Sequence, residues 1–103
     1  MSETYVAFSN ITVNDVIAYI RLDEADIDEA ERNLLSTILA AARSFVLTYT
    51  GKVPLQADTY PEFTIAVYAI CEEMHDKRTY TLDKNTLSPI IDSILGSRSV
   101  NLL

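Results

Sequence analysis

Glycine and proline are scarce in this chain of 103 residues, which holds two glycines, three prolines and no tryptophan. Glycine and proline interrupt helices and strands, so their scarcity indicates long regular elements joined by few turns. Apolar residues nevertheless make up 49% of the chain. A chain of this length can bury one hydrophobic core, and we therefore expect a single domain over residues 1–103.

Basic residues are also few. Eight lysines and arginines stand against fifteen aspartates and glutamates, giving a formal net charge of −7. Proteins that grip nucleic acid normally present a basic surface to the phosphates, and this chain has too little basic charge to form one. The composition therefore disfavours direct reading of DNA or RNA.

Cysteine and histidine occur once each. Cys71 cannot form an internal disulfide, and its place in an apolar stripe predicts a buried, unreactive thiol. Glu72 and His75 have the Glu-x-x-His spacing of di-iron bundles, but such a site needs a second motif and two further glutamates. We interpret His75, with Lys77 and Arg78, as cations at the carboxyl end of a helix.

The chain has no glycine-rich phosphate loop and no Gly-x-Ser-x-Gly elbow. We therefore expect no metal, no cofactor and no enzymatic activity. The first residues, MSETYVAF, lack the basic start and apolar block of a signal peptide, and no apolar run approaches the roughly 18 residues that span a membrane. The single cysteine is consistent with a reducing cytosol.

Apolar spacing predicts an all-α fold, a compact bundle of about four helices. The first helix follows Thr12, with Asp15 placed to complete a capping box, and ends at residues 23–26. The second is the longest, from a cap at Asp26 to a stop at Gly51. It carries two apolar stripes, so we expect it to be central and covered from two sides. The first stripe is Ile27, Ala30, Leu34, Ile38, Ala41, Phe45 and Tyr49, and the second is Leu35, Leu39, Ala42 and Val46.

The other two helices follow proline signals. The third is predicted to begin with a cap at Thr59 and to fray near Tyr80, and the fourth covers residues 88–96. Residues 1–10 form a short arm that lies on the domain or docks onto a partner. Residues 97–103 form a tail.

Acidic residues are dense at the start of the second helix: Asp23, Glu24, Asp26, Asp28, Glu29 and Glu31. A calcium-binding EF-hand loop would need a glycine and a downstream glutamate that this stretch lacks. Two interpretations stay open. The carboxylates are a solvated helix start, or they form a negative surface for a partner's basic groups.

Aromatic residues exceed what a small core needs, and tyrosine is enriched at protein interfaces. Tyr5, Phe8, Tyr60, Tyr68 and Tyr80 are in this group. Four arginines, Arg21, Arg43, Arg78 and Arg98, are scattered along this acidic chain. Each has two interpretations, a contact with an acidic partner or an ordinary surface charge, and for any single arginine the second is favoured. The candidate protein-interface residues are Arg21, Lys52, Arg78, Arg98, Tyr60 and Tyr80.

Four segments in this order resemble one known family. They are YIRLDEADID, LLSTILAAARSFVLTYTGK, PEFTIAVYAICEEMHDKR and IIDSILGSR. In residues 11–100 the chain resembles the head–tail connector (adaptor, or head-completion) proteins of long-tailed bacteriophages and prophages. Arg78 falls on an arginine of the family's pattern and Arg98 on its closing arginine, whereas Lys77 departs from the family's asparagine.

The resemblance implies a structural virion component and no enzyme. Protomers of this family join into a homo-oligomeric ring, typically twelvefold, between the portal protein and the stopper or tail-completion protein. The ring completes the head after packaging, and DNA passes through it without sequence-specific binding. The expected location is the virion neck, with a monomer in the host cytoplasm before assembly.

Two other functions compete with this one. A small helical regulatory or protein-binding module would need a basic recognition helix, and the sequence offers none. An enzyme with a site formed between subunits would have His75 as its only candidate acid–base group.

Overall fold

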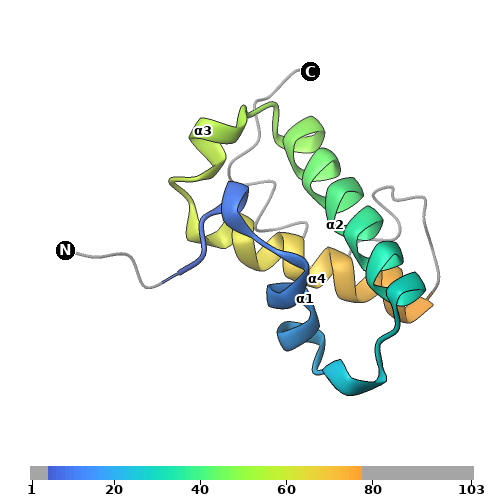
Figure 1. Cartoon of the computed structure of the whole chain (residues 1–103). Coiled ribbons are helices and arrows are strands. Elements are labelled where there is room, and N and C mark those ends of the chain that lie inside the picture. The colour runs from blue at the N-terminus through green and yellow to red at the C-terminus, as the bar shows by residue number, and fades with distance from the viewer. Residues whose placement is uncertain (1–4, 78–103) are drawn as a thin grey trace.

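The computed structural model describes residues 5–77, apart from the side chains of Glu24 and Lys77. Over these residues the fold is all-α and contains no strand, which confirms the predicted class (Figure 1). The elements are the 3-10 turn η1 (Phe8–Asn10), α1 (Val13–Ile20), the 3-10 turn η2 (Glu24–Asp26), α2 (Glu29–Thr50), α3 (Pro54–Ala57) and α4 (Pro61–Lys77). The predictions for residues 88–96 and 97–103, and for Arg78, Tyr80 and Arg98, lie outside this part of the chain.

Helix α1 starts as predicted. The Thr12 hydroxyl accepts a hydrogen bond from the Asp15 backbone N–H at 3.2 Å, and the Asp15 carboxylate accepts one from the Thr12 N–H at 2.9 Å. This is a complete capping box. The helix ends earlier than predicted, at Arg21, whose left-handed backbone (φ 68°, ψ 36°) turns the chain out of the helix.

Helix α2 is the long central element, and it packs against both α1 and α4 (Figure 1). Its cap is Asp28 instead of the predicted Asp26, because the Asp28 carboxylate accepts the Glu31 N–H at 2.8 Å while Asp26 closes η2. The predicted stop at Gly51 is confirmed. Gly51 is left-handed (φ 71°), and its N–H donates to the Leu47 carbonyl at 2.9 Å.

Helix α3 was not predicted. Pro54 occupies the first position of this one-turn helix, where its missing N–H is not needed. Gln56 caps this turn by accepting the Val53 N–H at 3.0 Å. The Thr59 hydroxyl donates to the Gln56 carbonyl at 2.7 Å, so Thr59 closes α3, and α4 begins at Pro61.

The core lies where α1, α2 and α4 meet. All four residues of the second stripe of α2 are buried, and α4 contributes Phe63, Ala66, Val67, Ile70, Cys71 and Met74. Burial raises the pKa of the Cys71 thiol to about 12, so the reactive thiolate is scarce at neutral pH. The prediction of a buried cysteine is confirmed. Within residues 5–77, no helix is long and apolar enough to cross a membrane.

Residues 5–10 of the predicted arm pack on the domain. Tyr5 donates its hydroxyl to the Asp58 carbonyl at 3.1 Å, and the Ser9 N–H donates to the Asp58 carboxylate at 2.8 Å. Thr64 of α4 donates its hydroxyl to the Val6 carbonyl at 2.6 Å. Of the two alternatives for this segment, the structure gives the first: the segment lies on its own domain.

Phe8 is part of the core. The interpretation of Phe8 as an aromatic residue in excess of the core was therefore wrong. The η1 turn directs its side chain inward, where 2% of the residue remains exposed. Its ring meets Phe63 edge-on, with centroids 6.5 Å apart and planes at 69°. A short segment whose aromatic is buried in this way contributes to the stability of the monomer.

Candidate functional site

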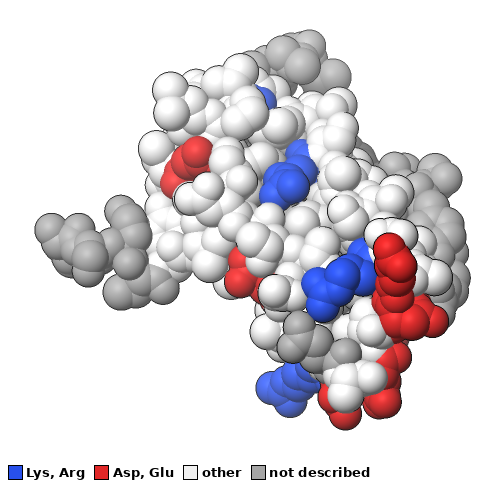
Figure 2. Space-filling model, in the orientation of Figure 1, with Lys and Arg blue, Asp and Glu red and all other residues white. Residues whose placement is uncertain are grey.

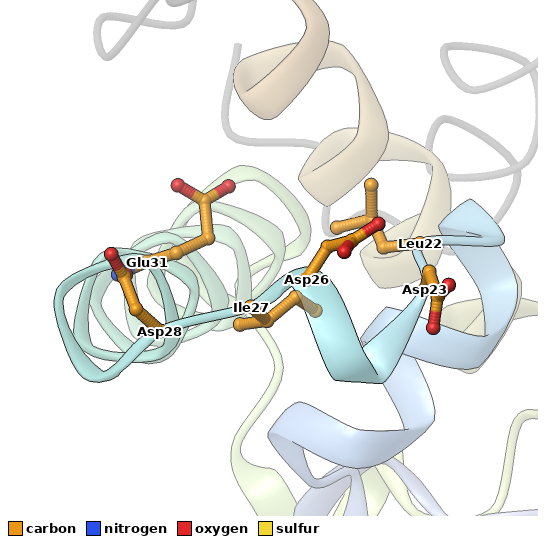
Figure 3. Close-up of a pocket in the computed structure, with 6 residues that line it drawn as sticks. All are labelled: Leu22, Asp23, Asp26, Ile27, Asp28 and Glu31. Atoms are coloured by element: carbon orange, nitrogen blue, oxygen red, sulfur yellow. The ribbon is translucent and has the colours of Figure 1, made fainter.

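An acidic hollow lies at the point where the chain passes from η2 into α2. It encloses about 250 Å³ and is lined by Leu22, Asp23, Asp26, Ile27, Asp28 and Glu31. Figure 3 shows the four carboxylates spread around Leu22 and Ile27, without convergence on one point. In keeping with that spread, the described residues contain no group of three or more histidines, cysteines or carboxylates that could hold a metal ion.

Two of these carboxylates have local structural roles. Asp28 caps α2, where the positive end of the helix dipole also favours negative charge. Asp23 accepts the Ala25 N–H at 3.0 Å and so shapes η2. Asp26 is different, because its exposed carboxylate makes no hydrogen bond or ion pair with any residue in 5–77. Asp26 is therefore the member of the hollow that is best placed to meet an external cation.

Glu31 connects the hollow to α4. Its Oε2 lies 2.6 Å from Nε2 of His75, and the two side chains are 29% and 13% exposed. The sequence interpretation treated His75 as a helix-end cation next to Glu72, but its partner is a carboxylate 44 residues earlier in the chain. Glu72 is exposed on the same helix. The Glu-x-x-His spacing thus does not make a pair here, and His75 instead ties the end of α4 to the start of α2.

Both arginines of α2 donate hydrogen bonds to other residues of the same chain. Arg32 donates to the Asn14 side-chain carbonyl at 2.9 Å, and Arg43 donates to the Ile11 carbonyl at 2.9 Å. The acceptor of this Arg43 hydrogen bond is thus a backbone carbonyl and not a carboxylate. Both arginines fasten the α1 region to α2. Arg21 and Lys52 are then the lysine and arginine side chains, among those that the structure describes, with neither a hydrogen bond nor an ion pair to residues 5–77.

Carboxylates are concentrated at the start of α2, where Arg32 also lies, and Lys52 follows its other end. In Figure 2 most of the acidic side chains on the visible face lie toward the end where α2 begins in Figure 1, with basic side chains beside them. Lys52 follows the Gly51 stop at the opposite end of this 22-residue helix. At 1.5 Å per residue the two ends are about 33 Å apart. The molecule thus presents an acidic end and, a helix length away, a lysine with no ion pair to residues 5–77.

The tyrosines that the sequence analysis named and the structure describes differ in their ring contacts. Tyr60 is half-buried, and its ring lies 5.2 Å from that of Phe63, so part of it belongs to the core. Tyr68 stacks on Tyr19 at 5.0 Å, and burial, with the charge of Asp15, raises the pKa of its phenol. Tyr19 is 39% exposed, so this pair forms an aromatic surface on α1 and α4. Tyr68 was named from the sequence as a surplus aromatic residue, whereas Tyr19 and the pairing were not predicted.

Arg21 holds a backbone conformation that glycine adopts more easily. Replacing Arg21 with glycine is expected to raise the free energy of unfolding by about 1 kcal/mol, because a side chain in the left-handed region costs about that much. Gly51→Ala, which places a side chain in the same region, is expected to lower it by about 1 kcal/mol. Urea denaturation measures both. A loss of stability in Arg21→Gly would show that the arginine side chain holds the monomer together.

Comparisons with family models, curated proteins and solved structures found no match to this chain.

Two parts of the site were not predicted. The Glu31–His75 pair joins residues on different helices, and a single sequence gives no sign of which distant residues meet. Leu22 and Ile27 line the hollow among the carboxylates. Their place there could be predicted only if the path of η2 were known. The cluster of acidic residues itself was found from the sequence, because it is local.

Proposed function

We propose that this protein is a structural subunit that assembles side by side into a closed homo-oligomeric ring, as a head–tail connector between portal and stopper or tail. The resemblance in residues 11–100 supports the family assignment. The structural observation that carries the proposal is the separation of the acidic hollow, at one end of α2, from Lys52 beyond the other end.

Such separation suits a heterologous contact. The acidic hollow of one copy faces Lys52 of the next copy. Each copy therefore offers its hollow to one neighbour and its Lys52 to the other. A contact of this kind repeats by rotation and closes into a ring when the angle divides a full turn. Asp26 supplies the carboxylate for Lys52, since it has no partner among the described residues.

The charge of the chain fits a channel for DNA. A lining that attracted phosphates would hold the duplex, whereas a net charge of −7 gives the ring no basic surface to grip it. Passage of DNA then needs no sequence recognition. The ring's task is mechanical: to extend the portal and to offer a surface to the next component.

Sedimentation velocity over a range of protein concentrations tests the proposal. We expect a monomer in dilute solution and one larger species of fixed size at high concentration, because a closed ring has no free ends. A continuous series of sizes would indicate open filaments, and a monomer at every concentration and with the portal protein present would count against self-assembly. Tight, salt-sensitive DNA binding would favour a regulatory protein instead.

A further inference from the structure

The start of α3 presents apolar side chains to solvent. Four large apolar side chains in residues 5–77 are exposed, and two of them are Val53 and Leu55, at 55% and 79%. Pro54 between them is exposed as well. Single apolar residues on a surface are ordinary, but three in succession on one turn are a candidate contact site. We call residues 53–55 the α3 tip.

The α3 tip is held in place from its inner side. Ala57 is completely buried and lies two positions after Leu55, on nearly the opposite side of a helix with 3.6 residues per turn. Asp58, directly after α3, accepts hydrogen bonds from the Tyr5 hydroxyl and the Ser9 N–H. Leu55 therefore points away from the domain on a fixed turn, and its burial against a partner costs little ordering of the backbone.

The acidic hollow has the complementary composition. Leu22 and Ile27 are half-buried and lie among its carboxylates (Figure 3). An apolar centre within a polar rim is the usual anatomy of a protein contact. The hollow encloses about 250 Å³. An apolar cavity of roughly 150 Å³ holds benzene, so the hollow has room for one leucine side chain.

We propose that the α3 tip of one copy enters the acidic hollow of the next copy, with Leu55 against Leu22 and Ile27. The inference rests on the proposed ring contact and adds its apolar part. Lys52 stands three residues before Leu55, so the same approach brings its ammonium group to the carboxylates of the rim. The charges match, because residues 52–56 carry one charge, that of Lys52, and the hollow carries four carboxylates.

The apolar part is needed because one ion pair is too weak to hold a ring. An exposed pair of lysine and carboxylate contributes little in water, and salt screens it. A leucine that passes from 79% exposed to buried contributes more, and this contribution does not depend on opposite charges. Leu55 thus supplies affinity, and the charges select which surfaces meet.

Truncation of Leu55 tests the strength of this contact. We expect Leu55→Ala to raise the concentration needed for assembly by at least about tenfold, because the buried apolar area is lost. Ile65→Ala is the matched control, since Ile65 is 49% exposed on α4 and does not line the hollow. It should assemble at the concentration of the unaltered protein. Circular dichroism checks that both variants stay folded, and equal assembly of the two would overturn the proposal.

A disulfide tests the geometry. Leu55→Cys and Ile27→Cys are made as separate proteins, mixed and oxidised, and Cys71 stays unreactive because burial raises its pKa to about 12. We expect a bridge between positions 55 and 27 of different chains, which requires Cα atoms within about 7 Å. Mass spectrometry of the linked peptides identifies it. Ile65→Cys in place of Leu55→Cys should form no such bridge.

The outcomes separate this inference from the ring proposal. Rings that form in sedimentation without a bridge between positions 55 and 27 would overturn the inference and leave the ring. Leu55→Cys that links mainly to itself would place the α3 tip in a two-fold contact, which also overturns the inference. Absence of assembly at every concentration would overturn both.

Discussion

Replacing Phe8 with alanine is expected to lower the free energy of unfolding by about 3–5 kcal/mol, the usual cost of removing a buried phenylalanine side chain. Phe8 lies near the amino terminus, and only the structure places it in the core, at 2% exposure against Phe63. A loss of this size would consume much of the stability of a domain of this length. Thermal or urea unfolding of the two proteins measures it.

Leu55→Ala is the control for this prediction. Leu55 is 79% exposed on α3, so truncating it should change the stability by less than about 0.5 kcal/mol. A double-mutant cycle with Phe63→Ala should add a coupling of about 0.5–1.5 kcal/mol for the edge-on ring pair. An unchanged stability in Phe8→Ala would mean that the arm is loose in the monomer and is available for a partner.

The second large effect concerns assembly. Asp26→Lys is expected to raise the concentration needed for ring formation by at least about tenfold, because like charges placed together across a contact cost several kcal/mol. Lys52→Glu should do the same from the other side of the contact. The double variant restores opposite charges with their positions exchanged, so it should recover much of the assembly. Light scattering or sedimentation over a concentration series gives the protein concentration at which each of the three variants assembles.

Glu72→Lys provides the matched charge change. Glu72 is exposed on α4 and does not line the hollow, so the variant should assemble at the same concentration as the unaltered protein. Circular dichroism establishes that all variants keep their helices. If Asp26→Lys and Glu72→Lys behave alike, net charge and not the hollow controls assembly. If each single variant fails and the double variant does not recover, Asp26 and Lys52 do not face each other.

Local signals in the sequence predicted local structure well. The Thr12–Asp15 capping box and the Gly51 stop each depend on residues within one turn, and both are present as predicted. The cap of α2 moved by two positions because Asp26 and Asp28 are equally suited by type, and only the path of η2 selects between them. Helix α3 was missed because one turn is too short to show a hydrophobic period.

Features that depend on tertiary contacts were beyond a single sequence. Phe8 was counted among the aromatic residues that exceed what a small core needs, but its ring packs against a helix more than fifty residues away. The Glu31–His75 pair joins residues 44 positions apart. The acidic hollow was predicted in part. Its charged residues were evident from their density, whereas the apolar residues between them needed the fold.

The central claim is that the side chains of this protein serve to pack its helices and to join copies of it. Electron microscopy of the concentrated protein, alone and with the portal protein, tests this claim most directly. We expect closed rings of one size with an open central channel, and no rings from Asp26→Lys under the same conditions. Particles that remain single subunits in both samples would contradict the claim.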